Sequence, residues 1–136
     1  MRPIRLQLSR AGGFSLQNVS RAANGLAAVN VARPGKWGNP WRVGETIDMR
    51  QANRWGWTIS SQGRKRVCAN RAEAVRAFRH CLAMDVAYHP AVIDALGGRN
   101  LACWCGPDSP CHADALLELA NGFATGKTPT GQDLSP

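Results

Sequence analysis

The chain has 136 residues, of which 44% are hydrophobic, and its formal net charge is +8. This length and composition predict one globular domain of ordinary size and exclude an intrinsically disordered chain. No stretch approaches the roughly 20 apolar residues of a membrane helix, and the first residues lack the apolar core of a signal peptide. Five cysteines, an odd number without a secretory segment, predict a reducing cytoplasm and free or metal-bound thiols.

The charge is divided unevenly along the sequence. Residues 1–80 hold 15 basic and 3 acidic side chains, whereas residues 81–136 hold 2 and 6. Of the 17 basic residues, 14 are arginine, whose planar guanidinium group suits bidentate contact with phosphate or carboxylate. A polyanionic partner, such as a nucleotide or a nucleic acid, would explain the basic half, and so would a solvated face that keeps the protein soluble.

The first half of the chain predicts short strands and one shaped loop. Residues 4–8 alternate apolar and polar side chains, and residues 28–32 form a second short strand. The next segment, residues 33–41, contains two prolines and two glycines and is typical of a shaped loop. Residues 55–68 predict a hairpin, with an exposed basic triplet near its tip.

Helical patterns dominate the second half. Asn70 and Glu73 form a capping box, and the amphipathic stripe that follows predicts a helix ending before residue 89. Three further elements are predicted in chain order: a short helix over residues 90–96, a buried strand over residues 100–104 and a last helix over residues 112–121.

The order of these elements predicts an α/β fold. We expect a small single-domain layer structure, with a short, partly parallel sheet flanked by helices and a hairpin inserted at about residues 55–68. The domain would span residues 1–122, and the polar residues 123–136 would form a loose tail. Ligands usually bind such sheets at the carboxyl ends of the strands, which directs attention to the segment after residue 102.

Residues 103–112 concentrate three of the five cysteines and one of the three histidines. One interpretation is a zinc site with the ligands Cys103, Cys105, Cys111 and His112. The spacing argues against it, because residues two apart in an extended strand lie about 6–7 Å apart, whereas two zinc-bound sulfurs lie within about 4 Å. The adjacent Cys111 and His112 would also diverge if both were helical.

A second interpretation is a reactive site at the start of the last helix, where free N–H groups bind anions and lower the pKa of a thiol. Cys111 would be the nucleophile, His112 an acid, base or phosphate donor, and Asp114 the group that orients the histidine. The third interpretation is structural, because cysteine is often buried as a small apolar residue. For Cys68 and Cys81 the structural role is preferred.

The loop at residues 33–41 offers a second set of candidate groups. Its ligand-binding candidates are Arg33, Lys36, Trp37, Gly38 and Asn39. The two cations would contact phosphate, a tryptophan would stack on a base, and the asparagine, held extended by the proline after it, would point its amide at a base edge or a ribose. The alternative is a shaped loop whose tryptophans cover the core and whose asparagine binds the backbone.

Two motifs in these segments resemble a known family. They are Lys36-Trp37-Gly38-Asn39-Pro40, and Cys103-Trp104-Cys105 followed by Pro110-Cys111-His112. Over about residues 29–121 the chain resembles the phage and bacterial domain-of-unknown-function family 4326. The resemblance implies a small cytoplasmic domain of a bacterial host, often phage-encoded. It implies no activity, because the family is described only by its sequence.

Three hypotheses about function follow. The first is a nucleotide- or nucleic-acid-directed enzyme or ligand-binding domain, with one pocket between the loop at residues 37–41 and the loop at residues 105–112. The second is a nucleic-acid-binding module stabilised by zinc. The third is a non-catalytic phage accessory protein that binds a host protein through its basic face. None of the three predicts a membrane partner, and all leave the substrate and the oligomeric state open.

Overall fold

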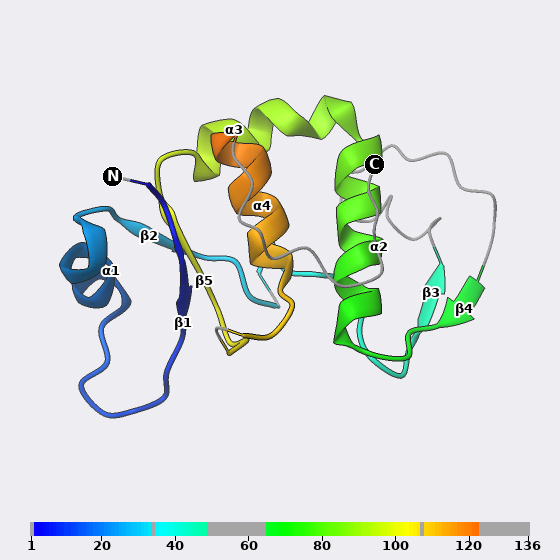
Figure 1. Ribbon diagram of the computed structural model, residues 1–136, viewed down its shortest axis with the longest axis horizontal. Coiled ribbons are helices and arrows are strands. Elements are labelled where there is room, and N and C mark those ends of the chain that lie inside the picture. Colours follow the sequence, from blue (N-terminus) through cyan, green and yellow to red (C-terminus); the bar gives the residue numbers. More distant parts are fainter. Residues whose placement is uncertain (1, 34, 49–64, 107, 123–136) are drawn as a thin grey trace.

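The computed structural model describes residues 2–33, 35–48, 65–106 and 108–122 (Figure 1). The strands are β1 (Arg5–Gln7), β2 (Ala28–Asn30), β3 (Thr46–Asp48), β4 (Lys65–Val67) and β5 (Asn100–Cys103). The helices are α1 (Leu16–Asn24), α2 (Arg71–Met84), the 3-10 helix η2 (Val86–Tyr88), α3 (His89–Leu96) and α4 (His112–Asn121). None of these helices is long and apolar enough to cross a membrane.

A three-stranded parallel sheet forms the centre of the molecule. Its order is β1-β5-β2, so the last strand of the chain lies between the first two. In Figure 1, α1 covers one side of the sheet, while α4 lies on the other side with α3 and α2 beyond it. The predicted α/β layer fold with a short sheet flanked by helices is therefore confirmed.

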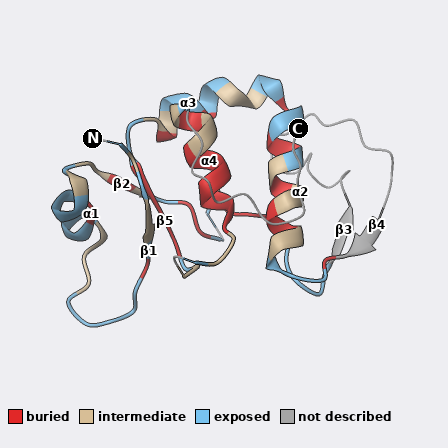
Figure 2. Ribbon diagram, in the orientation of Figure 1, coloured by how far each residue is buried: buried red, intermediate tan, exposed pale blue. Residues whose placement is uncertain are grey.

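The central strand β5 is buried along its whole length, as Figure 2 shows. Successive side chains of a strand point to opposite faces, and here they enter two different cores. Ala102 packs with Leu8 and Ala32 in a small cluster, whereas Leu101 and Cys103 belong to the larger core that includes α2, α3 and α4. Cover on both faces is typical of parallel strands, and it holds the end of β5 rigidly in place.

The helix ends follow the predicted capping pattern. The Asn70 side chain accepts a hydrogen bond from the Glu73 N–H, as the predicted capping box at α2 requires, but the Glu73 carboxylate accepts from the N–H of Ala69 rather than from that of Asn70. The helix ends at Met84 rather than reaching residue 88, because Asp85 leaves the helical conformation before η2 begins. Gly122 closes α4 with a φ of 73°, a conformation that favours glycine.

Two parts of the fold differ from the sequence-based expectation. Helix α1 was not predicted, although Ser15 caps its first turn and Gly25 ends it with a φ of 79°. Strand β4 overlaps the second arm of the predicted hairpin, but it pairs antiparallel with β3, which was also not predicted. The other predicted arm, within residues 55–60, and the tail at residues 123–136 lie outside the described residues.

Candidate functional site

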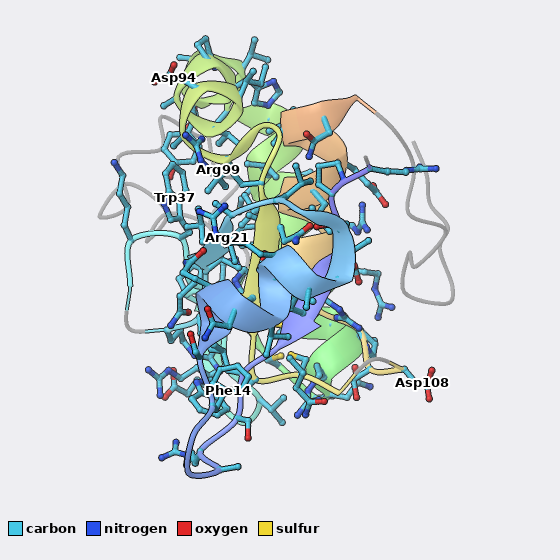
Figure 3. All side chains as sticks on the ribbon, turned by 90° about the vertical axis from the view of Figure 1, so that its left-hand side faces the viewer. Phe14, Arg21, Trp37, Asp94, Arg99 and Asp108 are labelled. Atoms are coloured by element: carbon cyan, nitrogen blue, oxygen red, sulfur yellow. The ribbon has the colours of Figure 1, made fainter. Side chains whose placement is uncertain are left out.

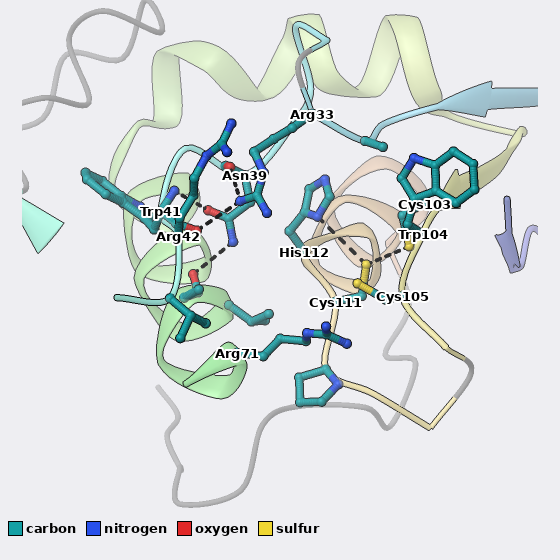
Figure 4. A pocket seen from close by; sticks show the side chains of 15 residues that line it. Arg33, Asn39, Trp41, Arg42, Arg71, Cys103, Trp104, Cys105, Cys111 and His112 are labelled. Carbon is teal, nitrogen blue, oxygen red and sulfur yellow. Dashed lines mark hydrogen bonds between the residues drawn. The ribbon is translucent and has the colours of Figure 1, made fainter. Parts of the chain in front are cut away.

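A pocket of about 460 Å³ opens beside the carboxyl end of β5 (Figure 4). Three parts of the chain line it: the loop after β2, the first turns of α2, and the loop that joins β5 to α4. Its polar, aromatic and sulfur-containing side chains are Arg33, Asn39, Trp41, Arg42, Arg71, Cys103, Trp104, Cys105, Cys111 and His112. The two loops that the sequence singled out thus face the same cavity.

Three cysteine side chains converge in this pocket. The sulfurs of Cys103, Cys105 and Cys111 all lie within 4.8 Å of one another, and those of Cys103 and Cys111 are 2.8 Å apart. The sequence argument against such convergence assumed that the strand continues through Cys105. That assumption is wrong, because β5 ends at Cys103 and the chain bends at the next two residues.

The second geometric objection to the zinc site is also wrong. Cys111 is not helical: it is the N-cap of α4, with extended backbone angles, and its sulfur accepts from the Ala113 N–H at 3.5 Å. Its side chain is therefore free to turn toward the histidine that follows. The Nδ1 atom of His112 lies 3.8 Å from the Cys111 sulfur. Because Cys111 is the N-cap of α4 and His112 its first residue, both side chains lie beside the carboxyl end of β5.

The imidazole of His112 is fixed in one orientation. Its Nε2 lies 2.6 Å from the carbonyl oxygen of Val31. A carbonyl only accepts, so Nε2 carries the proton, and in the neutral ring Nδ1 presents a lone pair. Burial lowers the pKa of His112, against hydrogen bonds to the backbone of Val31 and Trp37, so the ring is held neutral. Phe78 packs edge-on against the ring, with centroids 5.2 Å apart.

The three thiols have different acidities. Hydrogen bonds from Cys103 and Cys111 lower the pKa of Cys105 well below its ordinary value, and the charge of Arg71 lowers it further. The hydrogen bond with Cys105 raises the pKa of Cys103, with burial adding to the effect. Cys105 is therefore the thiol of the three whose pKa is lowered, and it is also the one that is only partly buried.

A buried ion pair between β1 and α4 lies next to the cysteine cluster. Arg5 reaches from β1 to the carbonyl of Gly106 at 3.1 Å, and its Nη1 lies 3.4 Å from the Asp114 carboxylate. Asp114 was predicted to orient the histidine, but it faces Arg5, while the two ring nitrogens of His112 face Val31 and Cys111. At the tip of the same loop, Asp108 is exposed and points away from the molecule (Figure 3).

The loop at residues 33–41 is held together by its own side chains. The Asn39 amide donates to the carbonyl of Ala74 in α2 and accepts from the Trp41 N–H, at 3.0 and 2.9 Å. The Arg33 guanidinium donates to the carbonyls of Asn39 and Trp41. Gly38 packs so closely that an added Cβ would lie 2.8 Å from the Arg33 Cα. These contacts shape the wall of the pocket.

Three of the predicted ligand-binding residues do not line the pocket. Trp37 packs against Tyr88 with ring centroids 5.9 Å apart, and the Lys36 ammonium lies 5.0 Å from the Trp37 ring centroid. Gly38, the third, serves the close packing of the loop. Arg42, Arg71 and Trp104 were not predicted as site residues, although they line the cavity. Arg71 lies in the first turn of a predicted helix, Trp104 ends a predicted strand and Arg42 follows the shaped loop, so their places in the sequence do not mark them as pocket residues.

Comparison with known proteins identifies the family. A family model described as "Domain of unknown function (DUF4326)" matches residues 16–122, a range that contains both pocket-forming loops. Searches of curated proteins and of solved structures found no match. The family model spans most of the sequence, and therefore the chain belongs to the DUF4326 family.

Proposed function

We propose that the protein is a zinc-stabilised domain that binds a nucleotide, or an exposed nucleotide of a nucleic acid, in the pocket beside its metal centre. The observation that supports it is the convergence of three sulfurs within 4.8 Å at a pocket that also contains three arginines. Thiolate sulfur and neutral imidazole nitrogen are the donors that zinc prefers in structural sites. The proposed ligands are Cys103, Cys105, Cys111 and His112.

The three sulfurs lie close enough together for one metal ion, whereas His112 is outside the set of ligand atoms that all lie within 4.8 Å of one another, so its imidazole would have to move toward the other sulfurs. Bond lengths of about 2.3 Å for sulfur and about 2.0 Å for nitrogen place a sulfur and a nitrogen ligand about 3.6 Å apart. The separation of the Cys111 sulfur and His112 Nδ1 is 3.8 Å. The Cys103 and Cys111 sulfurs would have to separate by about 1 Å from their 2.8 Å contact. The hydrogen bond from His112 to Val31 would orient the imidazole as an outer partner of the metal site.

Metal analysis of the full-length protein, purified without added zinc, tests this proposal. We expect one equivalent of zinc in the wild type and in Cys81→Ala, whose sulfur is buried elsewhere in the core. Cys105→Ser should lose most of the metal. Cobalt substitution adds a spectroscopic readout, since three thiolates and one imidazole around Co²⁺ give a distinctive absorption spectrum. Metal-free wild-type protein that is fully folded and binds neither ion would contradict the proposal.

The proposed location follows from the same chemistry. None of the five cysteines, all of which lie in the described residues, forms a disulfide bond, and a thiol-based metal site is best preserved in a reducing compartment. We therefore propose that the protein acts in the cytoplasm of a bacterial host. A phage origin is proposed separately, from the resemblance of its two motifs to the phage and bacterial family. Fractionation of cells that express the tagged protein tests the location. If the protein binds no nucleotide and no nucleic acid, this result would instead favour an accessory role in which its basic face binds a host protein.

A cysteine-dependent enzyme is the second candidate function, and the position of Cys105 favours it. This thiol opens onto the pocket, whereas Cys103 and Cys111 are 2% and 1% exposed. A thiolate there would attack an electrophilic carbon or phosphorus of the bound ligand, forming a bond to sulfur as the leaving group departs with the electron pair of the broken bond. If the purified protein contains no metal, and iodoacetamide modifies Cys105 far faster than the other cysteines, this second function replaces the first.

A further inference from the structure

Three arginines contribute to the wall of the pocket. Arg33 follows β2, Arg42 precedes β3, and Arg71 is the first residue of α2. Among the described residues, ion pairs join Arg5 to Asp114 and Arg79 to Glu118, and none involves this wall. Three guanidinium groups gathered around one cavity repel one another, so the arrangement is costly unless an anion occupies it.

This repulsion is one of the causes that lower the pKa of Arg33. Burial lowers its pKa, and the charge of Arg42 lowers it further; Cys105 and Glu45 oppose the shift, and Arg71 adds the smallest of the lowering effects. The guanidinium is held in place by the carbonyls of Asn39 and Trp41, so it cannot turn away to reduce the repulsion. A zinc ion with three thiolates and a neutral imidazole has one net negative charge, fewer than the positive charges on the wall.

An exposed aromatic ring lies at the other side of the cluster. Trp104 is 45% exposed and lines the pocket, which is unusual for the largest apolar side chain. In Figure 4 it lies across the cysteines and His112 from Arg42. The Arg10 guanidinium lies 4.7 Å from the ring centroid, which holds the indole by a cation–π contact. Such a ring is a stacking platform for a base.

We propose that the pocket binds a single nucleotide with a phosphate monoester, the phosphate on Arg33, Arg42 and Arg71 and the base on Trp104. The inference rests on the proposed function, since it uses the same pocket beside the metal centre. A cavity of about 460 Å³ accepts one small ligand and is too narrow for a duplex. The ligand is either a free nucleoside monophosphate or the phosphorylated end of a strand, since both offer the same group.

Calorimetric titration of the zinc-loaded, full-length protein tests this inference. The probes are the four ribonucleoside 5′-monophosphates, inorganic phosphate, and one short oligonucleotide with and without a 5′-phosphate. We expect saturable binding of at least one monophosphate. The double variant Arg42→Ala/Arg71→Ala should weaken it tenfold or more. Trp104→Ala should weaken monophosphate binding about tenfold and leave inorganic phosphate unchanged.

Matched controls separate these effects from general changes in charge or folding. Arg21→Ala removes an exposed arginine on α1, outside the pocket, and Ile93→Ala removes an exposed apolar side chain on α3. Both should bind like the wild type. Preferential binding of the 5′-phosphorylated oligonucleotide would assign the site to strand ends, and binding of monophosphates alone would assign it to free nucleotides. Equal binding of both oligonucleotides without binding of monophosphates would overturn the inference.

Failure of the inference is distinguishable from failure of the proposed function. Zinc content is measured on the same samples before titration. A protein that holds one zinc but binds no monophosphate and shows no preference for the 5′-phosphorylated oligonucleotide overturns the nucleotide site and leaves the metal centre standing. A protein that binds a monophosphate without zinc overturns the metal centre instead.

Discussion

The two loops that line the pocket contribute in different ways. The polar side chains of the loop at residues 33–41 bind backbone groups. The Arg33 guanidinium donates to a carbonyl of the loop, and the Asn39 amide accepts from an N–H group of the loop and donates to a carbonyl of α2. The loop at residues 103–112 presents sulfur and nitrogen lone pairs to one another and to the cavity. One loop is a shaped wall and the other holds the reactive groups. A rigid wall allows an arginine to stay at a fixed place beside the thiols.

The largest expected effect comes from the reactive loop. Cys111→Ser removes a proposed metal ligand and the sulfur that caps α4. Because a structural zinc ion contributes directly to folding, we expect a loss of more than about 4 kcal/mol in the free energy of unfolding, together with the metal. Urea denaturation and metal analysis measure both. A variant that retains zinc and wild-type stability would place Cys111 outside the metal centre.

The matching change in the wall should affect stability alone. Asn39→Ala leaves the Ala74 carbonyl and the Trp41 N–H without their partner in a buried place. We expect a loss of about 2–3 kcal/mol, because unsatisfied buried groups are costly. The zinc content of the folded fraction should not change. Urea denaturation and metal analysis of one sample measure the stability and the zinc content of this variant. Loss of zinc from Asn39→Ala would show that the loop at residues 33–41 is also needed to hold the metal.

A smaller effect is expected where the wall packs most tightly. In Gly38→Ala the new methyl group would lie 2.8–2.9 Å from the Arg33 Cα, N and Cγ atoms. The loop must shift, which should cost about 1–3 kcal/mol. Gly12→Ala is the matched control, since nothing lies within 4 Å of a Cβ at that position. Thermal denaturation of both variants measures the difference, and equal melting temperatures would show that the wall is deformable.

The smallest effect concerns pH. Burial raises the pKa of Cys81 to about 12. In the unfolded chain this thiol ionises near pH 8.5, so its contribution is present below that pH and is lost as the pH rises toward 12. We expect Cys81 to account for about 1–2 kcal/mol of the stability lost between pH 8 and pH 10. Cys81→Ala, compared by urea denaturation across this range, should show a correspondingly shallower decline. If the free energy of unfolding declined equally with pH in the wild type and in Cys81→Ala, the raised pKa of Cys81 would be contradicted.

Much of the fold could be predicted because its signals are local. The capping box at Asn70 and Glu73, the parallel sheet with its helices, and the helix after Cys111 all follow from short patterns. Helix α1 was missed even though Ser15 and Gly25 offered a cap at each end. Its apolar positions are few, so its stability comes from contacts such as the Gln17 side chain with Ala28. Such contacts join distant residues and leave no periodic pattern.

The candidate site was predicted less completely than the fold, because more of it depends on contacts between distant residues. The cysteines and the histidine were selected from their density, but the distance argument used an ideal strand and so gave the wrong separation. The bend after Cys103 and the extended cap at Cys111 are set by tertiary contacts, including the reach of Arg5 to Gly106. Arg71 comes close enough to affect Cys105 only through the packing of α2, and Arg42 lines the same pocket from another part of the chain. Spacing along the chain cannot show either effect.

The position of β5 has a consequence for how the protein is made. The first and second strands of the sheet both pair with β5, which begins only at Asn100. A nascent chain that has emerged as far as α3 holds two strands with no partner between them, and the Ile4 N–H has yet to meet the Asn100 side chain, 96 residues away. Such distant pairings form slowly, because a long loop must close first. The strongly basic half therefore leaves the ribosome before the sheet can assemble.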